Sequence, residues 1–181
     1  MIYNKTFIMK NGKECTIRNG VAEDGEAMYE HYVSTHSETD YLLSYPEEHA
    51  YNIEGESNFL KKEAESDNEV MLLAFVDGKI VGSSGITSLG NKYKIRHRAD
   101  FGITVCKEYW GLGIGRVLMN SCVECAKNAG YEQLELEVVA DNSKAIAMYK
   151  SIGFTELGRN PKGFKSKYSG YQELVHMGLE L

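Results

Sequence analysis

The sequence predicts an α/β domain whose sheet is mostly antiparallel, flanked by about four helices and containing one parallel pair of strands. Two turn signals, Asn11-Gly12 and Asp77-Gly78, each separate strand-like runs and predict hairpins of antiparallel strands. The order strand, glycine-rich turn, helix and strand over residues 92–139 predicts one right-handed crossover, and hence the parallel pair. With 181 residues the chain fits a single well-packed domain, 1–181.

The elements of the N-terminal half follow from turn signals and apolar spacing. Acidic residues lead the first helix, and apolar residues recur within it at helical spacing. A continuous apolar run before Asp77-Gly78 predicts a buried strand. In chain order we expect strands at 6–10 and 13–18, a helix from Glu23 to about His36, a loop over 37–46, a helix from Pro46 or Asn52 to Ala64, and strands at 70–76 and 79–87.

The C-terminal half contains the crossover. Leu134, Leu136 and Val138 alternate with glutamates, which predicts a strand, and Gly130 and Gly153 stand where helices are expected to end. In chain order we expect a strand or bent hairpin arm over 92–105, a helix over 114–128, a strand over 133–139, a short helix over 142–152 with Asp141 or Asn142 as its N-cap, and closing strands near 154–159 and 172–181.

Composition and charge narrow the class of protein. A formal net charge of −6 argues against nucleic acid as an obligate partner, because binding phosphates needs a basic surface, and it suits a cationic substrate better. The sequence has no apolar run near the roughly 20 residues of a membrane span, and residues 1–10 lack a signal-peptide core. We therefore expect a cytoplasmic protein with no membrane partner.

The cysteines predict buried free thiols and no metal. Cys122 and Cys125 form a C-x-x-C pair, but with Leu118 and Ala129 they follow helical spacing along one apolar stripe. The pair is not accompanied by a second Cys or His pair at ligand spacing, so a redox or metal site is the less favoured interpretation.

The glycine-rich turn is the most informative motif. Gly111, Gly113 and Gly115 alternate in a run that leads into the helix expected over 114–128. Because glycine lacks a Cβ, the backbone can approach a ligand closely, and amides at a helix start have no intrahelical acceptor. A phosphate fits such a turn. The alternative is a turn that merely links strand to helix.

The spacing argues against the dinucleotide fingerprint G-x-G-x-x-G. Counted from Gly111, this pattern needs a glycine where Arg116 stands, and hairpins precede the turn where a dinucleotide fold would have parallel strand-helix units. Glu132 and Glu135 do meet the acidic criterion about twenty residues onward. A nicotinamide or flavin enzyme therefore stays open as a minor alternative.

Two linked segments, Asp100 to Gly115 and Leu134 to Phe154, resemble the acetyl-CoA-dependent GNAT superfamily of N-acetyltransferases. The resemblance spans nearly the whole chain, including both hairpins, and implies that the parallel strand pair is splayed. It also implies direct transfer of an acetyl group from acetyl-CoA to a primary amine of a small molecule or a protein N-terminus. Trp110 departs from the motif, which usually has Gln or Arg there.

The resemblance implies a coenzyme A site. Backbone amides from Leu112 to Arg116 would hold the pyrophosphate, and the backbone of Ile103 and Val105 would pair with the pantetheine arm. The side chains of Arg116 and Lys144 either meet phosphates or are helix-surface charges. The cofactor-binding residues so implied are Ile103, Val105, Trp110, Gly111, Leu112, Gly113, Ile114, Gly115, Arg116, Asn142 and Tyr149.

Asn142, Tyr149 and Asp100 are candidates for the chemistry. On a helix, Asn142 and Tyr149 lie nearly on one face, roughly 10 Å apart along the axis. The resemblance implies that Asn142 contacts the pantetheine and that Tyr149 protonates the departing thiolate; a core aromatic is the alternative for Tyr149. Asp100, acting through water, is the candidate base and His97 the second, with a solvated or structural role open for both. Proximity alone can supply several kcal/mol, so a strong base is not required.

Two loops are candidate walls of the acceptor site. Carboxylates within residues 37–48 could attract a cationic amine, although Glu47 and Glu48 could equally start a helix. The loop 161–170 is basic, which argues against a cationic acceptor. Family members are often homodimers, so the resemblance implies one here. The alternative function is a catalytically weak acyl-CoA-binding sensor. The acidic residues in question are Glu38, Asp40, Glu47 and Glu48.

Overall fold

One mixed sheet organises the chain in a computed structural model that describes residues 2–181. Within these residues eight strands run in the order β1-β2-β3-β4-β5-β6-β8-β7, and only β5 and β6 are parallel. This confirms the predicted fold class. The elements are β1 Asn4–Ile8, β2 Glu14–Asn19, α1 Gly25–Glu38, α2 Ile53–Glu65, β3 Val70–Val76, β4 Lys79–Ser88, β5 Arg98–Val105, α3 Ile114–Asn128, β6 Gln133–Val139, α4 Ser143–Ile152, β7 Thr155–Ser166 and β8 Gly170–Glu180.

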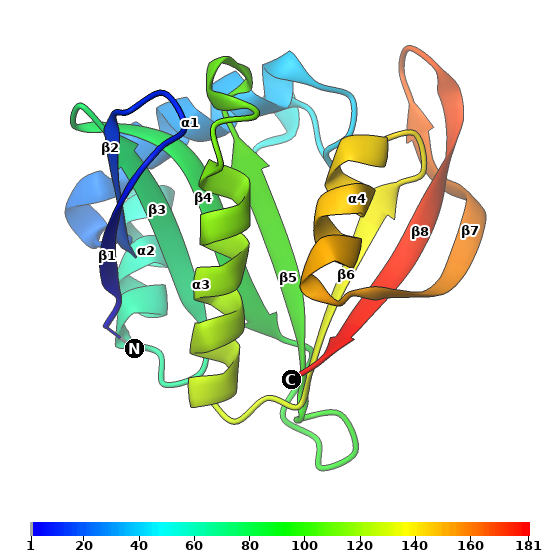
Figure 1. Cartoon of the computed structure of the whole chain (residues 1–181). Coiled ribbons are helices and arrows are strands. Elements are labelled where there is room, and N and C mark those ends of the chain that lie inside the picture. The colour runs from blue at the N-terminus through cyan, green and yellow to red at the C-terminus, as the bar shows by residue number, and fades with distance from the viewer. Residues whose placement is uncertain (1) are drawn as a thin grey trace.

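Helices cover both faces of the sheet, with α3 and α4 in front and α1 and α2 behind in Figure 1. The larger core lies under α3, whose Leu118 and Cys122 are fully buried against the sheet. A smaller core joins Met28 of α1 and Leu60 of α2 to Leu73 of β3. Burial raises the pKa of the Cys122 thiol to about 12, as expected for an inert free cysteine.

The two hairpins follow from their turn residues. Asp77 and Gly78 both adopt positive φ, 50° and 80°, and form the predicted two-residue turn between β3 and β4. The first turn is one residue longer than predicted, because the Met9 amide donates to the Lys13 carbonyl at 2.8 Å. Gly12, at φ 83°, takes the left-handed position that a three-residue turn requires.

Two expected boundaries, of β5 and β7, were wrong, and of the two expected starts of α2 the one at Asn52 was confirmed. β5 starts at Arg98 rather than near 92, since the Lys92 carbonyl accepts the Ile95 and Arg96 amides in a turn. α2 starts at Ile53, capped by Asn52, and Pro46–Glu48 forms a separate 3₁₀ turn. The expected loop 161–170 is mostly strand, because β7 continues to Ser166 and turns directly into β8.

The topology also decides between the classes left open by the glycine turn. A dinucleotide-binding domain is built from repeated parallel strand-helix units, whereas the neighbouring strands of this sheet include a single parallel pair among residues 2–181. The dinucleotide alternative is therefore rejected. Within the same described residues, none of the helices has both the length and the apolar character needed to cross a bilayer.

Candidate functional site

β5 and β6 separate after a short paired stretch. They pair only over Arg98–Asp100 and Gln133–Glu135, after which β5 continues beside β4 and β6 beside β8 (Figure 1). The Cys106 amide donates to Val81 and the Arg98 carbonyl accepts from Leu89, so the even-numbered residues of β5 direct their backbone groups toward β4. The odd-numbered residues face the opening instead, since backbone direction alternates along a strand.

Ile103 and Val105 are therefore among the residues of β5 whose backbone groups face the opening between the splayed strands. β6 does not pair with this part of β5. An extended ligand can add to such a strand edge through main-chain hydrogen bonds. The predicted pantetheine contact has the required backbone orientation.

The glycine turn forms a cradle of free amides. Gly111 and Gly113 have φ of 79° and 100°, values that favour glycine, and a Cβ at either position would meet no atom within 4 Å. The first bond into α3 is from the Val117 amide to the Gly113 carbonyl. In the described chain the three preceding amides, of Ile114, Gly115 and Arg116, donate to no protein acceptor. These amides suit an anionic group.

Trp110 links the glycine turn to the end of β5. Its indole Nε1 donates to the Val105 carbonyl at 2.6 Å, and the side chain stays 42% exposed. This bond takes one of the two lone pairs of a carbonyl that the pantetheine prediction also involves, and the Val105 amide stays available for a ligand. The bond also gives Trp110 a structural reason to replace the Gln or Arg of the motif.

Adding acetyl-CoA is expected to change the tryptophan fluorescence. Trp110 is the chain's single tryptophan, and a ligand that enters between the turn and β5 would shield its half-exposed ring from water. A fluorescence titration measures this, and Trp110→Phe is the matched control, which should lose the signal while calorimetry still detects binding. Calorimetric binding to the unaltered protein with no change in emission would contradict this location of the ligand.

The second motif packs against the first. The Asn142 side-chain oxygen accepts from the Ala145 amide at 3.3 Å, so it caps α4 and leaves its NH₂ group as a donor. A Cβ on Gly115 would lie 3.4 Å from the Met148 sulfur, an ordinary contact distance, so the start of α3 and the middle of α4 are adjacent. The predicted surfaces of the two motifs are neighbours in the fold.

Tyr149 packs at the point where β5 and β6 separate. Its ring is only 7% exposed and lies edge-to-face on Phe101, the first residue of β5 beyond the paired stretch, with Phe154 on another side. Burial raises the pKa of the Tyr149 phenol to about 12. Its hydroxyl has no hydrogen-bond partner among residues 2–181, so the ring belongs to the core while the hydroxyl stays available.

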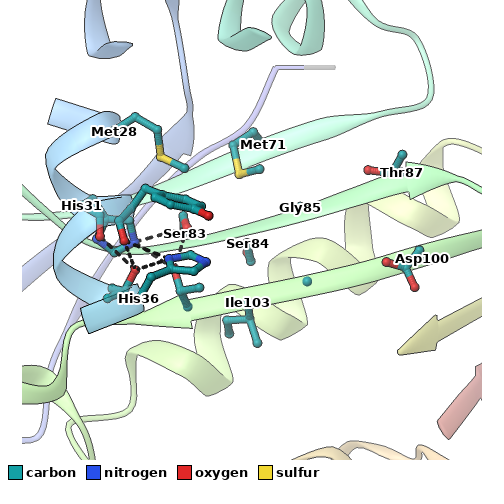
Figure 2. Close-up of a pocket in the computed structure, with 14 residues that line it drawn as sticks. Met28, His31, His36, Met71, Ser83, Ser84, Gly85, Thr87, Asp100 and Ile103 are labelled. Carbon is teal, nitrogen blue, oxygen red and sulfur yellow. Dashed lines mark hydrogen bonds between the residues drawn. The ribbon is translucent and has the colours of Figure 1, made fainter. Parts of the chain in front are cut away.

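A cavity of about 270 Å³ lies on the opposite face of β5, between α1 and the sheet (Figure 2). Its floor consists of three cross-strand pairs of β4 and β5, and the middle pair has no side chains, which leaves the space open. Figure 2 shows His31 and His36 of α1 at one end of the cavity and Thr87 and Asp100 at the other. The three pairs are Ser83 with Thr104, Gly85 with Gly102, and Thr87 with Asp100.

His31 forms the closed end of the cavity, and it was not among the residues predicted from the sequence. Its Nε2 lies 2.9 Å from Thr104 Oγ1 and 3.2 Å from Ser83 Oγ, and its Nδ1 lies 3.4 Å from Cys106 Sγ. Burial, with a smaller effect of nearby His36, lowers the pKa of His31 to about 4, so the imidazole is neutral. In the sequence, the three-residue spacing of His31 from the apolar Met28 was the signal that could have placed His31 on the buried face of α1.

Asp100 is at the open end, and its pKa rises to about 6. The largest cause is desolvation, although the residue stays exposed at the mouth; repulsion from Glu137 and then Glu135 adds to it. His97, the second candidate base, does not line the cavity. The Arg116 side chain on α3 donates to Ser151 of α4 at 2.9 Å and so links the two helices.

The two predicted walls do meet, through a network around the half-buried Asp40 carboxylate. Asp40, which follows α1, accepts the hydroxyl of Ser166 at 2.6 Å and the Gln172 amide at 3.3 Å. Lys167 at the tip of the β7–β8 hairpin pairs with Glu47 at 2.5 Å. The basic hairpin therefore neutralises the acidic segment.

The predicted attraction of a cationic amine by these four carboxylates does not agree with their contacts. Besides Asp40 and Glu47, Glu38 accepts the Lys107 amide at 2.7 Å and Glu48 accepts the Tyr45 amide at 2.9 Å. The alternative that Glu47 and Glu48 start a helix agrees with the structure, although that helix is the separate 3₁₀ turn Pro46–Glu48 and not α2. Asp100 is left as the carboxylate that lines the cavity.

Comparison with known proteins identifies the class. The family model "Acetyltransferase (GNAT) family" matches residues 25–154, and the chain belongs to this family. It is therefore grouped with the acetyl-CoA-dependent N-acetyltransferases.

Particular relatives agree with this class. A crystal structure of a GNAT-family acetyltransferase from Streptococcus pneumoniae is 29% identical, with a TM-score of 0.88 over 92% of this chain and 99% of that one. The structure of yncA from Salmonella typhimurium, solved with its cofactor acetyl-CoA, is 19% identical and has a TM-score of 0.81 over 92% and 94% of the chains.

Three curated relatives match over shorter stretches. The L-amino acid N-acetyltransferase AaaT of Escherichia coli is 32% identical over 59% of this chain and 65% of its own length. Across this and two further curated relatives, the chain spans between 22% and 65% of the relative's length.

Proposed function

We propose that residues 1–181 form a single-domain enzyme that transfers the acetyl group of acetyl-CoA directly to a primary amine held in the cavity beneath α1. One observation carries this proposal: the strand edge at Ile103 and Val105, the cavity and Tyr149 all meet on the short stretch of β5 just beyond its separation from β6. Donor and acceptor can therefore reach the same point from different sides.

The protein has candidate binding groups for each part of acetyl-CoA, the acetyl donor. The free amides of Ile114, Gly115 and Arg116 would hold the pyrophosphate, and the outward backbone of Ile103 with the Val105 amide would pair with the pantetheine arm. The Asn142 NH₂ group is a further donor at the start of α4. When bound, acetyl-CoA supplies the activated acetyl group.

Asp100 and Tyr149 have ionisation states that suit opposite roles. With a pKa near 6, the Asp100 carboxylate is charged at neutral pH and can take a proton, through water, from the amine as it attacks. With a pKa near 12, the Tyr149 phenol keeps its proton and can give it to the departing thiolate. We assign Asp100 as base and Tyr149 as acid.

Acetyl-CoA-dependent thiol release with a panel of primary amines tests the proposal. We expect turnover on some amines, and kcat/KM should fall as the pH is lowered through about 6, because protonated Asp100 cannot accept a proton. Asp100→Asn should lower kcat by roughly 10²–10⁴-fold and remove this part of the pH profile. Acetyl-CoA binding without turnover on any amine would instead favour the sensor function.

The stability of Asp100→Asn should change in the opposite direction. A carboxyl whose pKa is raised on folding, from about 3.9, loses folding free energy as the pH rises from about 4 to 6 and stays destabilising above that. The variant should therefore have a higher Tm than the unaltered protein at pH 7 to 8. A lower Tm there would mean that a lost structural contact explains any loss of activity.

The homodimer and the cytoplasmic location stay predictions.

A further inference from the structure

We infer that the acceptor is the amino terminus of a peptide, in which an uncharged amide stands next to the amine, rather than a free amino acid. This inference rests on the proposed function, because it concerns the amine that occupies the cavity beneath α1. It is carried by the charges that line this cavity and by a second cavity beyond Asp100 on the same face of the sheet.

The first cavity cannot pair an α-carboxylate with a cation. Its lining, drawn from residues 2–181, contains no lysine or arginine. Burial lowers the pKa values of both histidines, His31 to about 4, so they are neutral at pH 7. The charged group of the lining is Asp100. In a free amino acid the carboxylate lies two bonds from the amine and would meet Asp100 with like charge and with loss of water.

The cations on the neighbouring strands are already paired. Arg98 holds Glu135 through two nitrogens, one of them at 2.7 Å. Arg159 binds Glu156 at 2.6 Å and Glu173 at 3.1 Å. The third basic residue there, His176, places its Nδ1 3.7 Å from Glu137 Oε1. An incoming carboxylate would have to displace one of these internal partners.

A second cavity, of about 320 Å³, lies beyond Asp100 over β6, β8 and β7. This cavity lies on the same face of the sheet as Asp100. Paired residues, and residues two apart on one strand, share a face. Asp100 is paired with Glu135, Glu137 lies two residues further along β6, and Glu137 is paired with His176 of β8. Its lining residues are Glu137, Leu157, Gly158, Arg159, Asn160, Leu174 and His176.

This second cavity suits the backbone of a peptide better than a small amine. Its outer wall is β7, where the pairing with β8 is irregular around Gly158 and again beyond Asn160, so the regular ladder of backbone bonds is interrupted. A Cβ on Gly158 would meet no atom within 4 Å, so a ligand can approach the backbone there. The first residue of the acceptor would occupy the cavity beneath α1, and the following residues would lie along β7.

The experiment compares matched acceptors at saturating acetyl-CoA. For alanine, methionine and phenylalanine, kcat/KM is measured for the free amino acid, its amide and a dipeptide amide with the same first residue. We expect each amide to exceed its acid by at least tenfold and each dipeptide amide to exceed the simple amide. Acids that react as well as their amides would overturn the inference, and dipeptides no better than amides would overturn the role of the second cavity.

A variant isolates the charge argument. Thr87→Lys would add a cation directly opposite Asp100, and the ratio of amide to acid should fall by about tenfold or more. If the variant folds and its ratio of amide to acid is unchanged, the charge argument is contradicted. If the variant does not fold, the ratio of amide to acid in the unaltered protein decides the inference. Failure of the proposed function would look different, because neither acids nor amides nor simple amines would then be acetylated.

Discussion

Tyr149→Phe is expected to lower kcat by roughly 10²–10⁴-fold while changing the Kd for acetyl-CoA by less than about threefold. The substitution removes only a hydroxyl that has no protein partner in the described chain, and the ring keeps its packing on Phe101 and Phe154. The loss would therefore fall on proton donation to the thiolate. Steady-state kinetics combined with calorimetric titration separates turnover from binding.

Tyr131→Phe is the matched control for this experiment. Tyr131 is also a buried tyrosine, but its hydroxyl accepts from Asn68 at 2.9 Å, far along the chain from the site residues. The control should lose about 1 kcal/mol of folding free energy and no turnover. If Tyr149→Phe turned over as fast as the unaltered protein, the tyrosine would be a core aromatic only and the acid would have to be water.

Gly113→Val is expected to weaken acetyl-CoA binding by about tenfold to over a hundredfold. A β-branched residue cannot adopt φ of 100° without strain, so the turn would shift and misdirect the amides that follow. The loss of one charge-assisted hydrogen bond, about 1.5–3 kcal/mol, corresponds to this range. Calorimetric titration with acetyl-CoA measures it.

Gly130→Val separates binding from backbone strain. Gly130 has φ of 81° and follows the opposite end of α3, and a Cβ added there would meet no atom within 4 Å, as at Gly113. Both variants should lower Tm to a similar extent, and only Gly113→Val should lose acetyl-CoA. Equal affinities in the two variants would show that the amide cradle does not hold the pyrophosphate.

Local chemistry explains which parts of the fold were predictable. The turn at Asp77-Gly78, the cap at Asn52 and the helix following Gly113 each depend on residues within a few positions of one another, so their sequence signals were sufficient. The start of β5 and the length of β7 depend on which strand lies alongside. Residues 92–97 have an extended, charged pattern but no partner strand, and they turn instead.

The same distinction holds for the candidate site. The glycine turn is a local motif, and its role in the fold could be read directly. The cavity could not, because it arises from the register that sets Gly85 opposite Gly102 and from the helix that carries His31 above them. The pairing of Asp40 with the β7–β8 hairpin joins residues more than a hundred positions apart. Without those contacts, the acidic segment looked like a substrate attractant.

The pair of glycines in the floor of the cavity also bears on how this protein can change its substrate over evolutionary time. A methyl group at Gly102 would meet no protein atom within 4 Å, whereas one at Gly85 would press on Met71 and on the Val70 carbonyl. Gly102 is therefore a position where acceptor size can drift at almost no cost to folding. Descendants of this chain can acquire narrower preferences through single substitutions there, while the acetyl-CoA machinery stays untouched.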